Sequence, residues 1–152
     1  MSEVAIREDT RKLLSFYVNG KLCAAPIESV SEIIGIQSST FVPCLPDHVK
    51  GVTNIRGKVV PLVELRILFN YEPIEYTDRT CIVIIEQDEF VVGYIIDEIA
   101  DVLTVSKNEV VDSQSGFKNE NEYVKEMIKT ENGVALLLDI EKLLSVREEI
   151  DL

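Results

Sequence analysis

Residues 49–66, with the sequence VKGVTNIRGKVVPLVELR, carry the pattern that decides the fold. Two runs of β-branched and other apolar residues flank an Arg56-Gly57-Lys58 turn, which is typical of a β-hairpin. A short helical pattern, Glu64 to Phe69, follows directly. The stretch therefore predicts a strand, a tight turn, a second strand and a short helix.

A second hairpin signal lies upstream. Asn19-Gly20 separates the apolar runs Leu13 to Val18 and Leu22 to Ala25, and Asn-Gly tolerates the positive φ angles of a type I′ turn. After Pro26, apolar residues three and four apart predict a short helix or helical turn over Ile27 to Ile34. The first half is thus predicted as hairpin, helical turn, loop, hairpin and short helix.

The second half shows the same series of signals. Its predicted elements are strands over Thr80 to Ile85 and Phe90 to Ile96, a segment Asp97 to Val105, a loop Asp112 to Glu122, a hairpin around Asn132-Gly133 and a helix over Asp139 to Val146.

The two halves also match residue by residue. An offset of 69 residues places Leu22 to Ile34 over Val91 to Leu103, so that Ile33 meets Val102 and Glu32 meets Asp101. An offset of 76 places Gly57 over Gly133, with a one-residue slip into the terminal helix. We interpret this as an internal duplication that gives two similar small β-barrels of about five strands. The alternative is a chance match of apolar residues between β-rich segments.

Composition narrows the function classes. The formal net charge is −12, from 27 acidic and 15 basic residues, which disfavours binding to nucleic acid or to anionic lipid. No apolar run approaches the ~20 residues of a membrane span, and the start lacks a secretory signal, so we expect a cytoplasmic protein without membrane insertion. Three cysteines without C-x-x-C spacing indicate reduced thiols, with Cys23 and Cys81 in the core.

Residues that could take part in catalysis or bind a cofactor or metal are scarce. The single histidine, His48, lies beside Asp47 in a loop without a nucleophile motif, and we expect it to be solvated. Neither phosphate-binding loop pattern nor a metal-ligand cluster occurs, so we expect no catalytic residue, no cofactor and no metal. Two alternatives stay open: a small enzyme with an acidic site at Glu32 and Asp101, and an SH3-like binder of Pro-rich peptides, although the chain has no Trp.

Residues 49–66 closely resemble the hallmark of the CheW family of chemotaxis coupling proteins, G-V-x-N-[LI]-R-G-x-[VI]-x-P-[VI]-x-[DE]-L-R, with Leu62 a mild variant. Residues 92–97 and 101–103 add to the resemblance, which extends from Leu13 to Leu144. It implies a mainly β fold of two SH3-like five-stranded β-barrel subdomains with a few short helices. A single CheW-like domain would cover residues 12–145, with approximate lobes 12–69 and 78–145 that can exchange elements.

The resemblance also implies a function. Members of the family are non-enzymatic adaptors that couple the cytoplasmic tips of methyl-accepting chemotaxis receptors to the regulatory domain of the histidine kinase CheA. The contacts would lie in an inter-lobe groove and at the barrel ends, and the adaptor would be recruited to membrane receptor arrays.

Site residues carry over from the family by position. Glu32 and Arg56 would support the groove as an ion pair; a direct receptor contact of Arg56 is the alternative, and the structural role is favoured. For the apolar receptor-binding candidates, burial in the core is the alternative. The receptor-binding positions implied by the resemblance are Val30, Ile33, Gly51 and Val102.

One further candidate comes from the residues themselves. Phe117 is an aromatic residue in the polar loop Asp112 to Glu122, and aromatic anchors are favoured at interfaces. We predict Phe117 as a kinase-interface residue, with local packing as the alternative.

Overall fold

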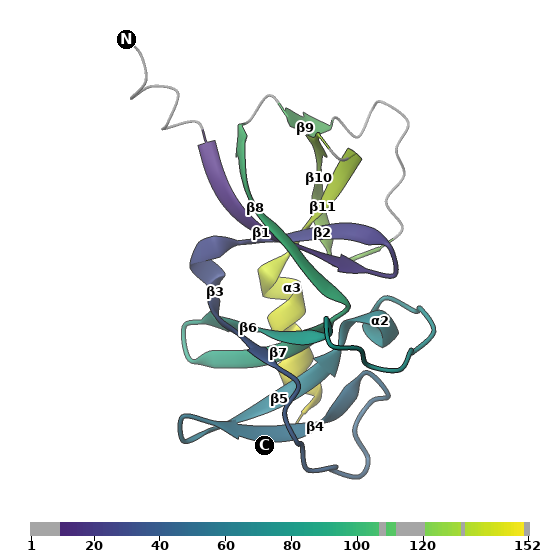
Figure 1. The fold of residues 1–152 in the computed structure, drawn as a ribbon. Coiled ribbons are helices and arrows are strands. Elements are labelled where there is room, and N and C mark those ends of the chain that lie inside the picture. The colour runs from purple at the N-terminus through teal and green to yellow at the C-terminus, as the bar shows by residue number, and fades with distance from the viewer. Residues whose placement is uncertain (1–9, 107–108, 112–120, 132, 151–152) are drawn as a thin grey trace.

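The strands form two sheets, one above the other in Figure 1. The computed structural model describes residues 10–106, 109–111, 121–131 and 133–150. The first sheet has the order β8 (Glu98–Ser106), β1 (Thr10–Val18), β2 (Lys21–Pro26), β11 (Gly133–Leu138), β10 (Val124–Thr130), β9 (Val110–Val111). The second has the order β3 (Val30–Gly35), β6 (Cys81–Gln87), β7 (Phe90–Ile96), β5 (Lys58–Glu64), β4 (Val49–Ile55). The predicted mainly β fold with two subdomains is confirmed.

Each sheet takes strands from both halves of the chain. The order β8-β1-β2-β11-β10 becomes β3-β6-β7-β5-β4 when every strand is replaced by its counterpart in the other half. The parallel pair β2–β11 in one sheet corresponds to the parallel pair β5–β7 in the other. The topology therefore supports the internal duplication and shows that each half contributes its first hairpin to one sheet and its third strand and second hairpin to the other.

Strand registers repeat as well. Leu14 pairs with Val102 in the first sheet, and Val83 pairs with Ile33 in the second, which is the same pair shifted by 69 residues. The hairpins β4–β5 and β10–β11 have identical registers and bulges at an offset of 75. The expected offset of 76 is thus wrong by one residue, because pairing aligns Leu62 with Leu137 and removes the need for a slip.

The hairpin turns follow from residues that accept positive φ. Asn19 and Gly20 have φ of 53° and 75°, and Arg56 and Gly57 have φ of 53° and 83°, as a type I′ turn requires. The side chain of Asn54 braces the second turn, since its Oδ1 accepts a hydrogen bond from the Gly57 N–H at 3.0 Å.

The expected helix over Ile27 to Ile34 is largely wrong. Only η1 (Ile27–Ser29) is helical, as a 3-10 turn, and the chain then continues as strand β3. Burial alternates along β3, with Val30, Glu32 and Ile34 half-buried and the residues between them exposed. Pairing with the buried strand β6 satisfies this period of two, so tertiary context overrides the helical spacing.

The helices that were expected are present and short. They are α2 (Leu65–Leu68), α3 (Ile140–Leu144) and the 3-10 segment η4 (Ser145–Glu149). Asp139 caps α3 by accepting a hydrogen bond from the Lys142 N–H at 3.2 Å. Among the described residues, no helix is long and apolar enough to cross a membrane.

Three apolar clusters hold the fold together. The largest contains residues of both sheets and of α2 and α3, including Phe16, Tyr94 and Leu143. Two smaller clusters fill the individual barrels, around Ile82 in one and around Leu13 in the other. Because the largest cluster lies between the sheets, the central hairpins are buried on both faces and the two subdomains share one core.

A partly buried ion pair also links the halves. Arg66 of α2 donates two hydrogen bonds from Nε to the Asp97 carboxylate at 2.9 and 3.0 Å and one from Nη2 at 2.8 Å. Its Nη1 donates to Asn19 Oδ1 at 3.3 Å and to the Glu72 carbonyl at 3.0 Å. Asp97 in turn accepts from the Asn19 N–H at 2.8 Å, so one cluster joins α2, the β7–β8 junction and the β1–β2 turn.

Candidate functional site

The two edge strands β3 and β8 carry equivalent exposed apolar side chains. Ile33 on β3 is 44% exposed and Val102 on β8 is 56% exposed. Both lie at the same register position, opposite Val83 and Leu14 respectively. Both are terminal strands of their sheets, so among the described strands each pairs along one edge only. Ile33 and Val102 are therefore open to a partner.

Val30 has a different environment. It is half-buried and packs against the central apolar cluster, as does its counterpart Ile99. A bulge separates Val30 from Glu32 in the pairing with β6. Ile33 is exposed while Val30 contacts the core, so these two candidates do not form one continuous apolar face.

Gly51 is buried, and its position depends on having no side chain. A Cβ there would lie 2.5 Å from the carbonyl oxygen of Thr40. Thr40 and Val52 exchange two backbone hydrogen bonds, of 2.8 and 3.0 Å, which fasten the loop of residues 36–48 to the edge of β4. The loop presents Phe41, which is 75% exposed. Gly51 thus allows the close approach of a loop that exposes an aromatic side chain.

The expected pairing of Arg56 with Glu32 is present, but its geometry is not bidentate. Arg56 Nη2 donates to Glu32 Oε2 at 3.1 Å, which joins the β4–β5 turn to β3. The Arg56 side chain is 77% exposed and that of Glu32 is 23% exposed. Solvent screens such a pair, so we expect it to contribute less than about 1 kcal/mol to stability. It leaves donors of Arg56 facing solvent.

Glu32 and Asp101 occupy equivalent positions on β3 and β8 but belong to different sheets. The backbone N–H and carbonyl of Asp101 are both hydrogen-bonded to the hydroxyl of Ser15, at 3.0 and 2.6 Å. Neither carboxylate lines the pockets described below. In the part of the chain that the structure describes, no three His, Cys, Asp or Glu side chains are grouped to hold a metal.

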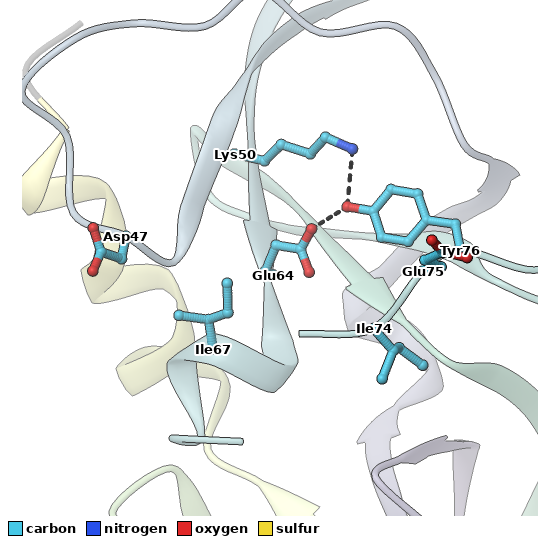
Figure 2. A pocket seen from close by; sticks show the side chains of 7 residues that line it. All are labelled: Asp47, Lys50, Glu64, Ile67, Ile74, Glu75 and Tyr76. Atoms are coloured by element: carbon cyan, nitrogen blue, oxygen red, sulfur yellow. Dashed lines mark hydrogen bonds between the residues drawn. The ribbon is translucent and has the colours of Figure 1, made fainter. Parts of the chain in front are cut away.

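A pocket of about 360 Å³ lies beside β4, β5 and the connector that follows α2, as Figure 2 shows. The hydroxyl of Tyr76 points between Lys50 and Glu64: it accepts a hydrogen bond from Lys50 Nζ at 2.9 Å and donates one to the Glu64 carboxylate. Lys50 Nζ also lies 4.1 Å from the centre of the Tyr76 ring. Burial, then the hydrogen bond to Glu64 and the charge of that carboxylate, raise the pKa of Tyr76. The Tyr76 hydroxyl therefore retains its proton, and its hydrogen bonds join the connector to the barrel.

The single histidine and the three cysteines lie in different environments. His48 is not solvated as expected, because its Nε2 lies 2.8 Å from Glu149 Oε2 and its side chain is only 17% exposed. Cys23 is buried, Cys81 is half-buried and Cys44 is exposed, and all three are free thiols. Burial raises the pKa of the Cys23 thiol to about 12.

The exposure of some apolar side chains was not predicted from the sequence. Phe41, Val59 and Phe90 are 75%, 51% and 50% exposed. Val59 and Phe90 stand in β-rich runs, where burial is the usual expectation, whereas Phe41 lies in the loop of residues 36–48. The kinase-interface candidate Phe117 lies outside the described residues.

Comparisons with known proteins agree with this architecture. The model of the CheW-like domain family matches residues 12–148. The chain is 35% identical over 129 residues to the chemotaxis protein CheW of Bacillus subtilis (strain 168), covering 84% of this chain and 83% of the relative. It is 30% identical over 149 residues to the chemotaxis protein CheW of Klebsiella aerogenes, covering 97% and 90%.

A solved structure is similar in fold. The crystal structure of the scaffolding protein TtCheW from Thermoanaerobacter tengcongensis superposes with a TM-score of 0.77 at 22% identity. The match covers 85% of this chain and 88% of that one. It supports the two-subdomain β architecture.

Proposed function

The chain belongs to the family of CheW-like domains, and from that premise we propose that it couples the cytoplasmic tips of methyl-accepting receptors to the regulatory domain of CheA. It is a chemotaxis scaffold and not an enzyme. Its recruitment to receptor arrays at the membrane would follow from the receptor contact.

The observation that carries the proposal is the pair of equivalent apolar side chains on the two edge strands. Ile33 and Val102 are exposed and occupy the same register position in the two sheets. Exposed branched side chains on a rigid sheet suit the apolar face of a helix, and nearby polar groups such as Glu32 and Arg56 can fix its register. We assign the receptor contact to these positions.

Val30 and Gly51 would act at this surface indirectly. Val30 packs on the central cluster and so supports the strand that displays Ile33. Gly51 holds the loop of residues 36–48 close to β4, which places Phe41 at the surface. Substitutions at Val30 or Gly51 would weaken the receptor contact by moving these neighbours.

The test measures binding of the full chain to a receptor tip fragment and, separately, to the CheA regulatory domain. Ile33→Asp and Val102→Asp should each weaken receptor binding at least tenfold, because an interface would have to bury an unpaired carboxylate. Ile74→Asp is the matched control, since Ile74 is 46% exposed on the connector and belongs to neither β3 nor β8. Circular dichroism and thermal unfolding check that each variant folds. Receptor affinities equal to that of the control would refute the assignment.

A further inference from the structure

The internal repeat allows each polar contact in one half to be compared with its counterpart in the other. In the first half, Arg66 stands beside the β1–β2 turn, between Asn19 and Asp97, with its side chain only 13% exposed. The cation is held by one carboxylate, one amide oxygen and one backbone carbonyl. This position in the fold is therefore built to hold a guanidinium.

At the counterpart position, carboxylates stand in place of Asn19 and Arg66. At the offset of 75 given by the hairpin registers, Glu141 of α3 replaces Arg66. At the offset of 69, Asp88 in the β6–β7 turn replaces Asn19, and the two turn residues have similar φ of 57° and 53°. In the described part of the chain neither Asp88 nor Glu141 forms an ion pair.

A pocket opens at this place. Its volume is about 690 Å³, and Asp88 and Glu141 both line it. Phe90, which is 50% exposed, lines it together with Leu144 and Ile150. The remaining lining residues are Gln87, Ser145, Arg147 and Glu148.

The charge of the lining favours a cation. Three carboxylates, those of Asp88, Glu141 and Glu148, stand against one guanidinium. That guanidinium, of Arg147, donates from Nη1 to the Val91 carbonyl at 3.3 Å and so is engaged with the backbone of β7. An incoming basic side chain would find free carboxylates beside an apolar wall.

We propose that this pocket docks a segment of a partner protein that presents an arginine or lysine beside an apolar side chain. The apolar side chain would pack on Phe90 and Leu144. The cationic head would lie between Asp88 and Glu141, the residues that replace Asn19 and Arg66 of the other half. Phe90 and the two carboxylates together make the recognition specific for a basic, apolar segment.

The probe is the tripeptide amide N-acetyl-Leu-Arg-Leu, titrated into the 15N-labelled full chain at low ionic strength. Its matched control replaces arginine by citrulline, which has the same shape and no charge. We expect amide shifts that cluster at Phe90, Glu141 and Leu144, and affinity at least fivefold greater for the arginine peptide.

Variants distinguish binding of the peptide in the pocket from its attraction to the acidic surface in general. Glu141→Lys and Asp88→Lys should each remove the preference for arginine over citrulline. Glu131→Lys is the control, because Glu131 is exposed in the β10–β11 turn outside the pocket lining. The proposal is overturned if Glu131→Lys reduces binding as much as Glu141→Lys does, or if both peptides bind equally to the unmodified chain. Both acidic positions are exposed, so the variants should fold.

Discussion

Replacing Gly51 by alanine should loosen the loop of residues 36–48 and destabilise the protein by about 1–3 kcal/mol. The added Cβ would lie 2.5 Å from the Thr40 carbonyl oxygen, whereas ordinary contacts begin at 3.4 Å. The loop must therefore move by roughly 0.9 Å, which breaks or stretches the two hydrogen bonds between Thr40 and Val52. Each such bond contributes about 0.5–1.5 kcal/mol, which gives the expected range.

Urea unfolding measures the decrease in the free energy of unfolding, and amide hydrogen exchange shows which residues are affected. The amides of Thr40 and Val52 should exchange faster in Gly51→Ala. The amides of the buried strand β6 should remain the more protected ones. Gly35→Ala is the matched control: Gly35 lies in a strand of the same sheet, and a Cβ there meets nothing within 4 Å. If both variants have equal stability and the Thr40 amide stays protected in each, the close approach does not constrain the loop.

Further predictions concern a core glycine, the partly buried ion pair and the cysteine thiols. Gly93→Ala should cost about 1–3 kcal/mol by overpacking, because a Cβ at position 93 would lie 2.8 Å and 2.9 Å from two side chains of the barrel core; calorimetry should show a lower Tm. Arg66→Met should cost roughly 3–5 kcal/mol by leaving Asp97 partly buried and unpaired, and a double variant that also carries Asp97→Asn should recover part of that loss in urea unfolding. At pH 8 the exposed Cys44 thiol should react with a disulfide reagent within minutes, whereas Cys23 should stay unmodified until the protein unfolds, because burial raises its pKa to about 12 and keeps it protonated.

Local signals predicted the elements that depend on neighbouring residues. The Asn19-Gly20 and Arg56-Gly57 turns have the positive φ angles that their sequences favour, and α2 and α3 follow their hairpins as expected. Strand β3 was missed because Val30 and Ile33 have helical spacing, and only pairing with β6 makes them strand residues. Sequence patterns cannot report a partner strand that lies far along the chain.

The repeat was visible in the sequence, but the exchange between halves was only an option. Equivalent strands have similar apolar patterns, so a β5-like strand fits beside either β2 or β7, and residue type alone does not choose. For the candidate site, the sequence supplied Ile33 and Val102 correctly as equivalent positions. It could not supply the contact of Gly51 with Thr40, because that distance depends on how a loop folds back.

The exchange of second hairpins has a consequence for the history of the chain. A polypeptide containing one repeat would supply strands to two different sheets and could complete neither. Two copies would have to pair, each contributing its third strand and second hairpin to the sheet of the other, so a half-length form would be expected to fold only as a homodimer. In this single chain the two halves meet that requirement together and need not be identical, and Arg66 and Glu141 differ at equivalent positions.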